Sequence, residues 1–394
     1  MKKSILIILT FAALLTSCSK NLEVPSEASI DANAEMSTAD VDRLLTGLFI
    51  AIDNPSSYGY FQILYPCLLA DNFVKVKFQW FQVNDAAEHS IHESDILNEY
   101  NYKNFYKGVS RANFILGLPA TTNVQAAQAK YCRALSYFRL VDLYGDVPLV
   151  DENYDGKPIA KSTVAEIYNF MISDLLFAKK NAPAFNDKNA AVSNTMPTQE
   201  AAQALLARVY RLKGDITAAA AEAESLITSG KFSLSTNPLQ RTSEVIMRFA
   251  NNPDVDNARW GYIMSTGAKT WNCIAASPNL TKLLDADDTR NILYEVGEVN
   301  KVPYTFCVKY DVENNSDLLI SRIAEMYLIS AEAGNTARLT ELQAIRKSSL
   351  SLADERRLEL AFEWVRWSDM KHAGLTNYLV PLPLAAIKAN PLLK

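Results

Sequence analysis

Hydrophobic residues recur at three- and four-residue spacing along most of the chain, as the buried face of an α-helix requires. This spacing is clear over residues 41–49 and again over residues 100–116. It continues from residue 124 to 144, where Gly145 and Pro148 are expected to end the helix. The pattern therefore predicts a mainly helical protein.

A helical hairpin is predicted over residues 200–227. The small and apolar positions of the tetratricopeptide pattern are occupied there by Leu206, Ala207, Tyr210, Gly214 and Ala219. Small alanines allow two antiparallel helices to approach closely, although Gln203 and Ala223 replace the Trp and Phe of that pattern. Further helices are predicted over residues 164–180, with Ser162 or Thr163 as the cap, and over 318–333, 341–347 and 354–370. We thus expect helical repeats over about 124–230 and 317–372.

The helical spacing is lost between residues 231 and 316. This stretch contains four prolines, Pro238, Pro253, Pro278 and Pro303. Long irregular segments between regular elements frequently carry binding residues. We therefore expect an irregular insertion with a role in ligand binding.

The N-terminus is typical of a secreted, lipid-anchored protein. Lys2 and Lys3 precede a short apolar run over residues 4–15, and Cys18 follows two small residues. The run is shorter than the roughly 20 residues that a spanning helix needs. We predict a signal peptide over residues 1–17, lipidation of Cys18, a polar tether over 18–34 and one folded domain over 35–394, with the lipid as the only membrane attachment.

Charge and cysteine content exclude several classes of protein. The chain has 39 Lys and Arg against 44 Asp and Glu, a net charge of −5, which argues against nucleic-acid binding. The four cysteines beyond Cys18 show no zinc-site spacing. Cys132 fits a buried helical position, and the sequence allows a Cys273–Cys307 bridge without requiring one.

Several separated blocks carry a family resemblance. They are RALSYF at 133–138 with LYGDVPL at 143–149, RIAEMYLI at 322–329 with AEA at 331–333, ERRLELAFE at 355–363 with RWSDMK at 366–371, and YLVPLP at 378–383 with NP at 390–391. Weaker blocks lie at 45–49, 70–72 and 111–113. In this order, behind the signal peptide, the blocks resemble the SusD/RagB-like outer-membrane lipoproteins.

The resemblance implies a scaffold of tetratricopeptide-like repeats that holds a loop-rich ligand-binding portion. It implies a cell-surface protein of the outer membrane that captures oligosaccharide and passes it to a SusC-like TonB-dependent transporter, without catalysis and without a cofactor. A peptide ligand, as in the RagB branch, and a purely protein-binding tetratricopeptide adaptor remain alternatives. The usual family members are longer, so the loops here are expected to be trimmed.

Two segments offer the side chains that sugar recognition needs, namely flat aromatic faces and nearby hydrogen-bonding groups. The first contains Phe78, Trp80, Phe81 and Asn84, and the second contains Arg259, Trp260, Tyr262, Trp271 and Asn272. Polar residues surround Trp80 and Trp260 most closely. The alternative for each aromatic residue is a position in the core or as a loop anchor.

Other polar clusters are expected to be structural. His89 and His92 lie near several carboxylates but lack a fixed third metal ligand. Glu355, Glu359 and Glu363 form one helical stripe, and we predict ion pairs with basic residues rather than a catalytic pair. We predict a polar helix end at residues 285–288. A lipid-anchored hydrolase would instead require carboxylates on opposite sides of a cleft.

Overall fold

The computed structural model describes residues 36–53, 61–76, 81–240, 242–250, 273–310 and 317–394, with the side chains of 61–63 left aside. Residues 38–394 form one compact unit. The predicted signal peptide, Cys18 and the tether lie outside the described residues. None of the described helices has the length and apolar character needed to cross a membrane.

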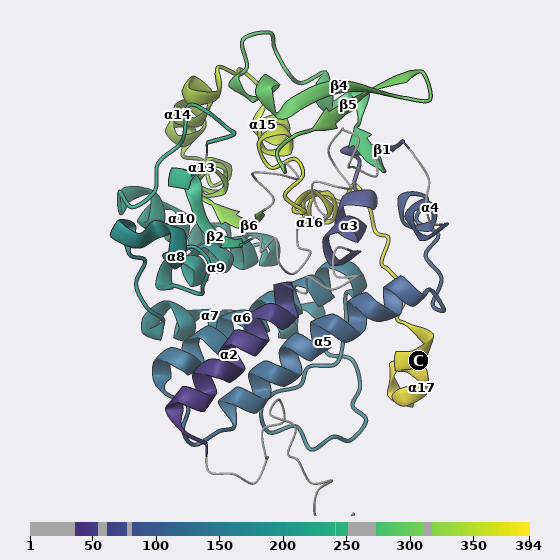
Figure 1. Cartoon of the computed structure of the whole chain (residues 1–394), viewed down its shortest axis with the longest axis vertical. Coiled ribbons are helices and arrows are strands. Elements are labelled where there is room, and N and C mark those ends of the chain that lie inside the picture. Colours follow the sequence, from purple (N-terminus) through teal and green to yellow (C-terminus); the bar gives the residue numbers. More distant parts are fainter. Residues whose placement is uncertain (1–35, 54–60, 77–80, 241, 251–272, 311–316) are drawn as a thin grey trace, which may run out of the picture. The chain divides into compact units, whose positions relative to one another are not determined.

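The first half of the unit is a stack of long helices (Figure 1). They are α2 (Thr38–Asp53), α5 (Ile96–Leu116), α6 (Asn123–Tyr144), α7 (Val164–Asn181), α9 (Gln199–Lys213) and α10 (Ile216–Thr228). Successive helices contact one another, α5 on α6, α6 on α7, α7 on α9 and α9 on α10, and α10 then packs on α13 (Ile323–Glu332). The predicted mainly helical fold is confirmed, and these neighbour contacts are those expected of stacked hairpins.

Local sequence signals set the ends of these helices. Thr163 and Glu166 form a reciprocal capping box at the start of α7, with the Thr163 amide 2.8 Å from the Glu166 carboxylate. Gly214 adopts a left-handed conformation, φ 92°, between α9 and α10. Both the cap and the hairpin turn agree with the prediction from sequence.

Two helices differ from the sequence prediction. The helix expected from residue 318 begins only at Ile323, because Leu318–Arg322 forms strand β6 against β2 (Val245–Phe249). The helix expected over 354–370 is divided into α15 (Leu352–Glu359) and α16 (Arg366–His372). Both segments are rich in apolar residues, so hydrophobic spacing could not reveal the strand or the break.

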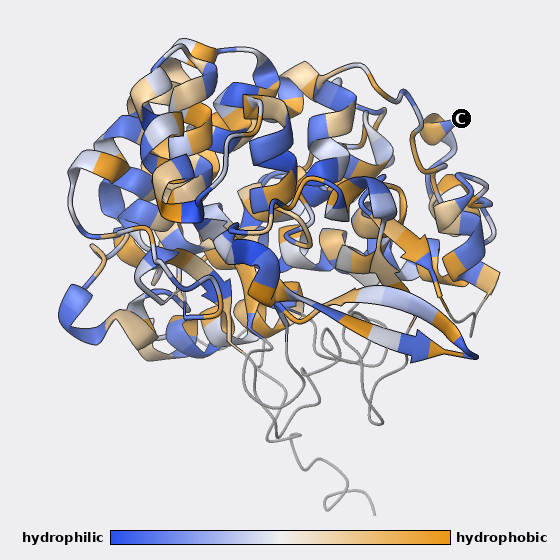
Figure 2. Cartoon of the chain, turned by 90° about the horizontal axis from the view of Figure 1, so that it is seen from above, coloured by the Kyte–Doolittle hydropathy of each residue, from blue (hydrophilic) through white to orange (hydrophobic). Residues whose placement is uncertain are grey.

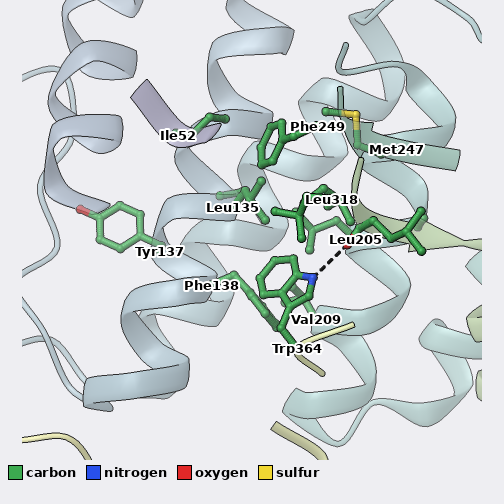
Figure 3. Packing of buried hydrophobic residues seen from close by; sticks show 14 of the residues in the cluster. Ile52, Leu135, Tyr137, Phe138, Leu205, Val209, Met247, Phe249, Leu318 and Trp364 are labelled. Atoms are coloured by element: carbon green, nitrogen blue, oxygen red, sulfur yellow. Dashed lines mark hydrogen bonds between the residues drawn. The ribbon is translucent and has the colours of Figure 1, made fainter. Parts of the chain in front are cut away.

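The break between α15 and α16 places an aromatic ring in the core. Phe362 and Trp364 have positive φ, 67° and 57°. The indole nitrogen of Trp364 donates to the Leu319 carbonyl at 2.9 Å, as the dashed line in Figure 3 shows. The guanidinium of Arg139 lies 5.1 Å from the same ring. Burial of the Trp364 ring and its hydrogen bond to Leu319 stabilise these positive φ angles, which a continuous α-helix cannot contain.

The remaining elements are short. The described strands form three antiparallel pairs, β1 (Phe73–Lys75) with β3 (Ile274–Ala276), β2 with β6, and β4 (Tyr294–Val299) with β5 (Val302–Cys307). The described part of the chain also contains the shorter helices α3 (Phe61–Leu68), α4 (Phe81–Ala87), η1 (Asp187–Asn189), α8 (Ala190–Ser193), η2 (Thr242–Glu244), α12 (Pro278–Thr281), η4 (Thr289–Leu293), α14 (Thr336–Arg346), α17 (Leu384–Ala389) and η5 (Pro391–Leu393). Helical spacing fails over residues 231–316, where the described part contains four of the six strands and only short helical turns.

A hydrophobic core joins the helical stack to the strands. In Figure 3, Leu135 and Phe138 of α6 lie near Leu205 of α9 and Phe249 of β2. Figure 2 shows hydrophilic and hydrophobic residues mixed along most helices, as amphipathic packing requires. The structure has Cys67, Cys132, Cys273 and Cys307 as buried thiols, so the bridge left open between two of them is not formed.

Two of the sequence blocks meet at the end of α6. Gly145 has a φ of 71°, and a Cβ added by substitution at this position would lie only 2.9 Å from the Leu379 side chain. The Val380 amide donates to the Leu143 carbonyl at 2.8 Å. The block at 143–149 and the block at 378–383 are therefore two sides of one contact in the fold.

Candidate ligand-binding surface

The short β1–β3 ladder connects the two segments that the sequence singles out for binding. Lys75 is paired with Ile274. One residue further, the Val76 amide donates to the Cys273 carbonyl at 3.0 Å. Residues 77–80 follow Val76 directly, and residues 251–272 end at Cys273. The points at which these two segments join the described structure, Val76 and Cys273, are thus neighbours, although they are 197 positions apart in sequence.

Residues before β1 are fixed by the C-terminal helices. Arg366 holds the Asp71 carboxylate with two hydrogen bonds, at 2.7 and 2.8 Å. Arg357 donates to the Asn72 side-chain oxygen at 2.8 Å. Partial burial raises the pKa of Asp71, but the hydrogen bond and charge of Arg366 outweigh it, so the pKa is lowered. A charged carboxylate therefore ties the start of β1 to α15 and α16.

Helix α4 carries the two candidate residues that the structure describes. Phe81, at its first position, is 62% exposed. Asn84 is half-buried, and its side-chain oxygen accepts a hydrogen bond from Lys75 Nζ at 2.8 Å. Lys75 also pairs with Glu88 at 2.8 Å. The structure thus presents one aromatic face to solvent and orients one amide beside β1.

A cavity of about 290 Å³ lies among α3, β1 and α4, and its polar lining residues are Asp71, Lys75 and His89. His89 Nε2 is 2.9 Å from the Leu69 carbonyl, and its ring stacks on Tyr378 with centroids 4.9 Å apart. His92 contacts Ser94 instead. Within the described ranges, no three His, Cys, Asp or Glu side chains are grouped as a metal site would require. The histidine pair therefore contributes to packing and local hydrogen bonds.

The other candidate residues lie outside the described part of the chain. They are Phe78, Trp80, Arg259, Trp260, Tyr262, Trp271 and Asn272. Lys75 was not singled out from sequence, although it contacts Asn84 and Glu88. A lone lysine in a short strand gives no local signal, and its role depends on the fold bringing α4 beside β1.

The stripe of three glutamates is confirmed as a buried ion-pair network. Glu355 pairs with Arg290 at 2.6 Å, and Glu359 pairs with Arg346 at 2.8 Å. Glu363 pairs with Arg322 at 2.6 Å and with Lys309. Glu244 completes this set through Arg322 and through Arg346 at 2.8 Å. We refer to these residues as the glutamate–arginine network.

The basic partners differ from those nearest in sequence. Arg356 pairs with Asp369 at 2.9 Å and Arg366 pairs with Asp71, because the break after α15 turns the chain away from a continuous stripe. Burial raises the pKa of Glu363, but Arg322 and Lys309 outweigh it and lower the value to about 2. Burial raises the pKa of Glu355, and Arg290 offsets only part of that rise. Carboxylates held by guanidinium groups in the interior are structural. The predicted polar helix end is confirmed at Asp288, which caps η4 and pairs with Arg290.

Comparison with known proteins agrees with this architecture. The sequence model of a family described as "Starch-binding associating with outer membrane", SusD-like, matches residues 22–211. SusD-like protein P2 of Formosa agariphila is 26% identical over 356 residues, covering 69% of each chain. A SusD-like protein of Bacteroides ovatus is 23% identical and covers 68% of this chain, which spans 64% of that relative.

Solved structures show the same fold. A SusD superfamily protein of Bacteroides vulgatus has a TM-score of 0.79 at 20% identity, covering 91% of this chain and 98% of the other. A structure described as a laminarin-binding SusD-like protein has a TM-score of 0.76 at 19% identity, covering 90% and 98%. The family model over residues 22–211, the matched relatives and the shared fold confirm the resemblance to the SusD-like family that the sequence blocks indicate.

Proposed function

We propose that this protein binds oligosaccharide at a surface around the joined ends of β1 and β3, and passes it to a SusC-like TonB-dependent transporter. Phe78, Trp80, Phe81, Trp260, Tyr262 and Trp271 would stack on sugar rings, and Asn84, Arg259 and Asn272 would bind hydroxyl groups. The single observation that carries the proposal is the hydrogen bond between Val76 and Cys273, from which both aromatic segments continue.

Binding without catalysis is the chemistry that the described residues support. Glu355, Glu359 and Glu363 are paired with Arg290, Arg322, Arg346 and Lys309. A glycosidase needs one protonated and one ionised carboxyl group across a substrate cleft. Aromatic faces and amides, by contrast, recognise a sugar without altering its bonds. The family description as starch-binding and the laminarin-binding neighbour favour a glucan among possible ligands.

The cellular setting completes the proposal. Cys18 would carry the lipid, and residues 18–34 would tether the folded unit at the outer face of the outer membrane. Isolation of the mature protein followed by mass spectrometry of its N-terminal peptide tests this step, and an unmodified thiol at Cys18 would contradict it. Co-purification of a large β-barrel protein after mild detergent extraction tests the transporter partnership.

Calorimetric titration with neutral oligosaccharides of different linkage tests ligand binding directly. We expect at least one series to bind, and Trp80→Ala to weaken that binding by roughly tenfold or more through loss of a stacking surface. Leu176→Ala is the matched control, because Leu176 is 45% exposed on the distant helix α7. Binding of peptides alone would favour a RagB-like carrier, and binding of neither would favour an adaptor.

A further inference from the structure

A second cavity lies on different elements from the β1–β3 surface. Its volume is about 640 Å³, within the range of about 300–1,000 Å³ that is usual for small-molecule sites. Helix α5 forms one wall, residues 148–159 form another, and the C-terminal segment with α17 and η5 closes it. Neither Phe81 nor Asn84, the two described candidate residues of the surface proposed above, lines this cavity, which we call the α5 pocket.

The walls of the α5 pocket are held by hydrogen bonds between segments. Tyr106 donates its hydroxyl to the Pro148 carbonyl at 2.6 Å. The Val150 amide donates to Tyr137 at 2.7 Å. Asn390 donates to the Ile159 carbonyl at 2.7 Å, which attaches the C-terminal segment. A cavity fixed at three points on its rim is preformed for a ligand.

The buried guanidinium of Arg133 fixes two polar side chains that line the α5 pocket. Arg133 is 1% exposed and donates to Asn113 Oδ1 and to Glu152 Oε2, both at 2.6 Å. Asp174 holds the other side of the guanidinium at 2.7 Å. Partial burial raises the pKa of Glu152, but its bond to Arg133 outweighs this effect and lowers the pKa. Glu152 therefore remains an ionised hydrogen-bond acceptor at neutral pH.

The lining of the α5 pocket combines aromatic rings with hydrogen-bond acceptors, and none of its described residues is Lys or Arg. Phe114 is 46% exposed and Tyr154 is 44% exposed, so both lining rings are accessible to a ligand. The charged lining residues are Asp151 and Glu152, both acidic. Such a site disfavours fatty acids, phosphates and uronic acids, because like charges repel. Exposed rings beside carboxylate and amide oxygens suit a ligand with apolar faces and many hydroxyl donors.

We propose that the α5 pocket is a second saccharide-binding site, for a neutral sugar unit, separate from the β1–β3 surface. Phe114 and Tyr154 stack on the sugar, while Asp151 and Glu152 accept hydrogen bonds from its hydroxyl groups. This proposal is argued from other residues than the first site, since none of the described residues of that site lines the α5 pocket. Two sites would let one chain hold separate portions of a long glycan and raise the effective concentration at each.

Saturation-transfer NMR and calorimetry with maltotriose and laminaritriose test the second site, in a background where Trp80→Ala weakens the first. We expect binding to persist in that background and to weaken by roughly tenfold when Phe114→Ala and Tyr154→Ala are added. Tyr154→Phe keeps the ring and should retain affinity. Trigalacturonic acid should bind at least tenfold more weakly than the neutral trimers.

The outcomes separate the two proposals. Loss of all binding in Trp80→Ala alone would overturn the second site and leave the first intact. Binding that ignores the Phe114→Ala and Tyr154→Ala changes would also overturn it, as would preference for a peptide over both trimers. Both aromatic residues are partly exposed, so thermal unfolding of the variants should match the parent chain and exclude misfolding as the cause.

Discussion

The glutamate–arginine network keeps its charged side chains buried and paired with one another, whereas the β1–β3 surface presents an aromatic ring to solvent. In the network, Glu359 is buried and three arginines surround it within 3.3 Å. At the surface, Phe81 is exposed and Asn84 is oriented by a single lysine. The three glutamates and Arg322 belong to the blocks that carry the family resemblance, whereas their partners Arg290, Lys309 and Arg346, like the candidate ligand residues, lie between blocks. The blocks therefore include part of the frame, by which we mean the helical stack and the glutamate–arginine network, whereas the residues proposed to bind ligand lie outside the blocks.

The largest effect is expected from breaking the network. Glu359→Ala would leave Arg322 and Arg346 buried without one of their main partners, and the cost is about 3–5 kcal/mol of unfolding free energy. Urea unfolding of the purified variant measures it. Glu341→Ala is the control, because Glu341 is 47% exposed in its pair with Arg338 and should cost less than about 1 kcal/mol. Equal effects of the two changes would contradict a structural network.

The network also predicts a pH dependence. The folded-state pKa of Glu363 is lowered to about 2, below its usual value of 4.5, so its contribution to stability is present above pH 4.5 and is lost as pH falls toward 2. Glu355 has the opposite shift and partly compensates. We expect Glu363→Gln to flatten the fall in unfolding free energy between pH 5 and pH 3. An unchanged slope would show that other carboxylates dominate acid unfolding.

The surface should show the reverse behaviour, with little effect on stability and a clear effect on ligand. Phe81→Ala removes an exposed ring, so unfolding free energy should change by less than about 0.5 kcal/mol. Affinity for the bound oligosaccharide should fall several-fold, measured by calorimetry. Phe81→Tyr, which keeps the ring, should retain most of the affinity. A variant that unfolds readily would mean that Phe81 serves the frame instead.

The smallest expected effect concerns a helix end far from both regions. Thr163→Ala removes one half of the capping box at α7 and should cost about 1 kcal/mol of unfolding free energy. Ligand affinity should not change, because α7 carries none of the proposed binding residues. Thr163→Ser should restore the cap in a thermal unfolding experiment. A change in affinity would show that α7 influences ligand binding, which would contradict its assignment to the frame alone.

The frame was largely predictable because its signals are local. Helical spacing, the Thr163 cap and the turn at Gly214 depend on residues a few positions apart, and the structure confirms each. Strand β6 and the break at Phe362 were missed, since both depend on distant partners such as β2 and Leu319. The same limit applies to the ion pairs, whose existence was predictable but whose partners were not.

The candidate site was predictable only as two separate segments. Residue types identified the aromatic runs around Trp80 and Trp260, but nothing local indicated that they continue from paired strands. That relation required the pairing of β1 with β3, in which Lys75 and Ile274 are 199 positions apart in sequence. The α5 pocket had no sequence signal either, because its lining comes from three distant parts of the chain.

A double-mutant cycle on oligosaccharide affinity with Trp80→Ala and Trp260→Ala tests most directly whether the two aromatic segments form one site. If they contact one bound oligosaccharide, each single change weakens binding, and the double change departs from additivity by about 0.5 kcal/mol or more. Calorimetry of the parent chain and the three variants with the same oligosaccharide provides the four affinities. Purely additive losses, or no loss from either change, would contradict a shared site at the joined ends of β1 and β3.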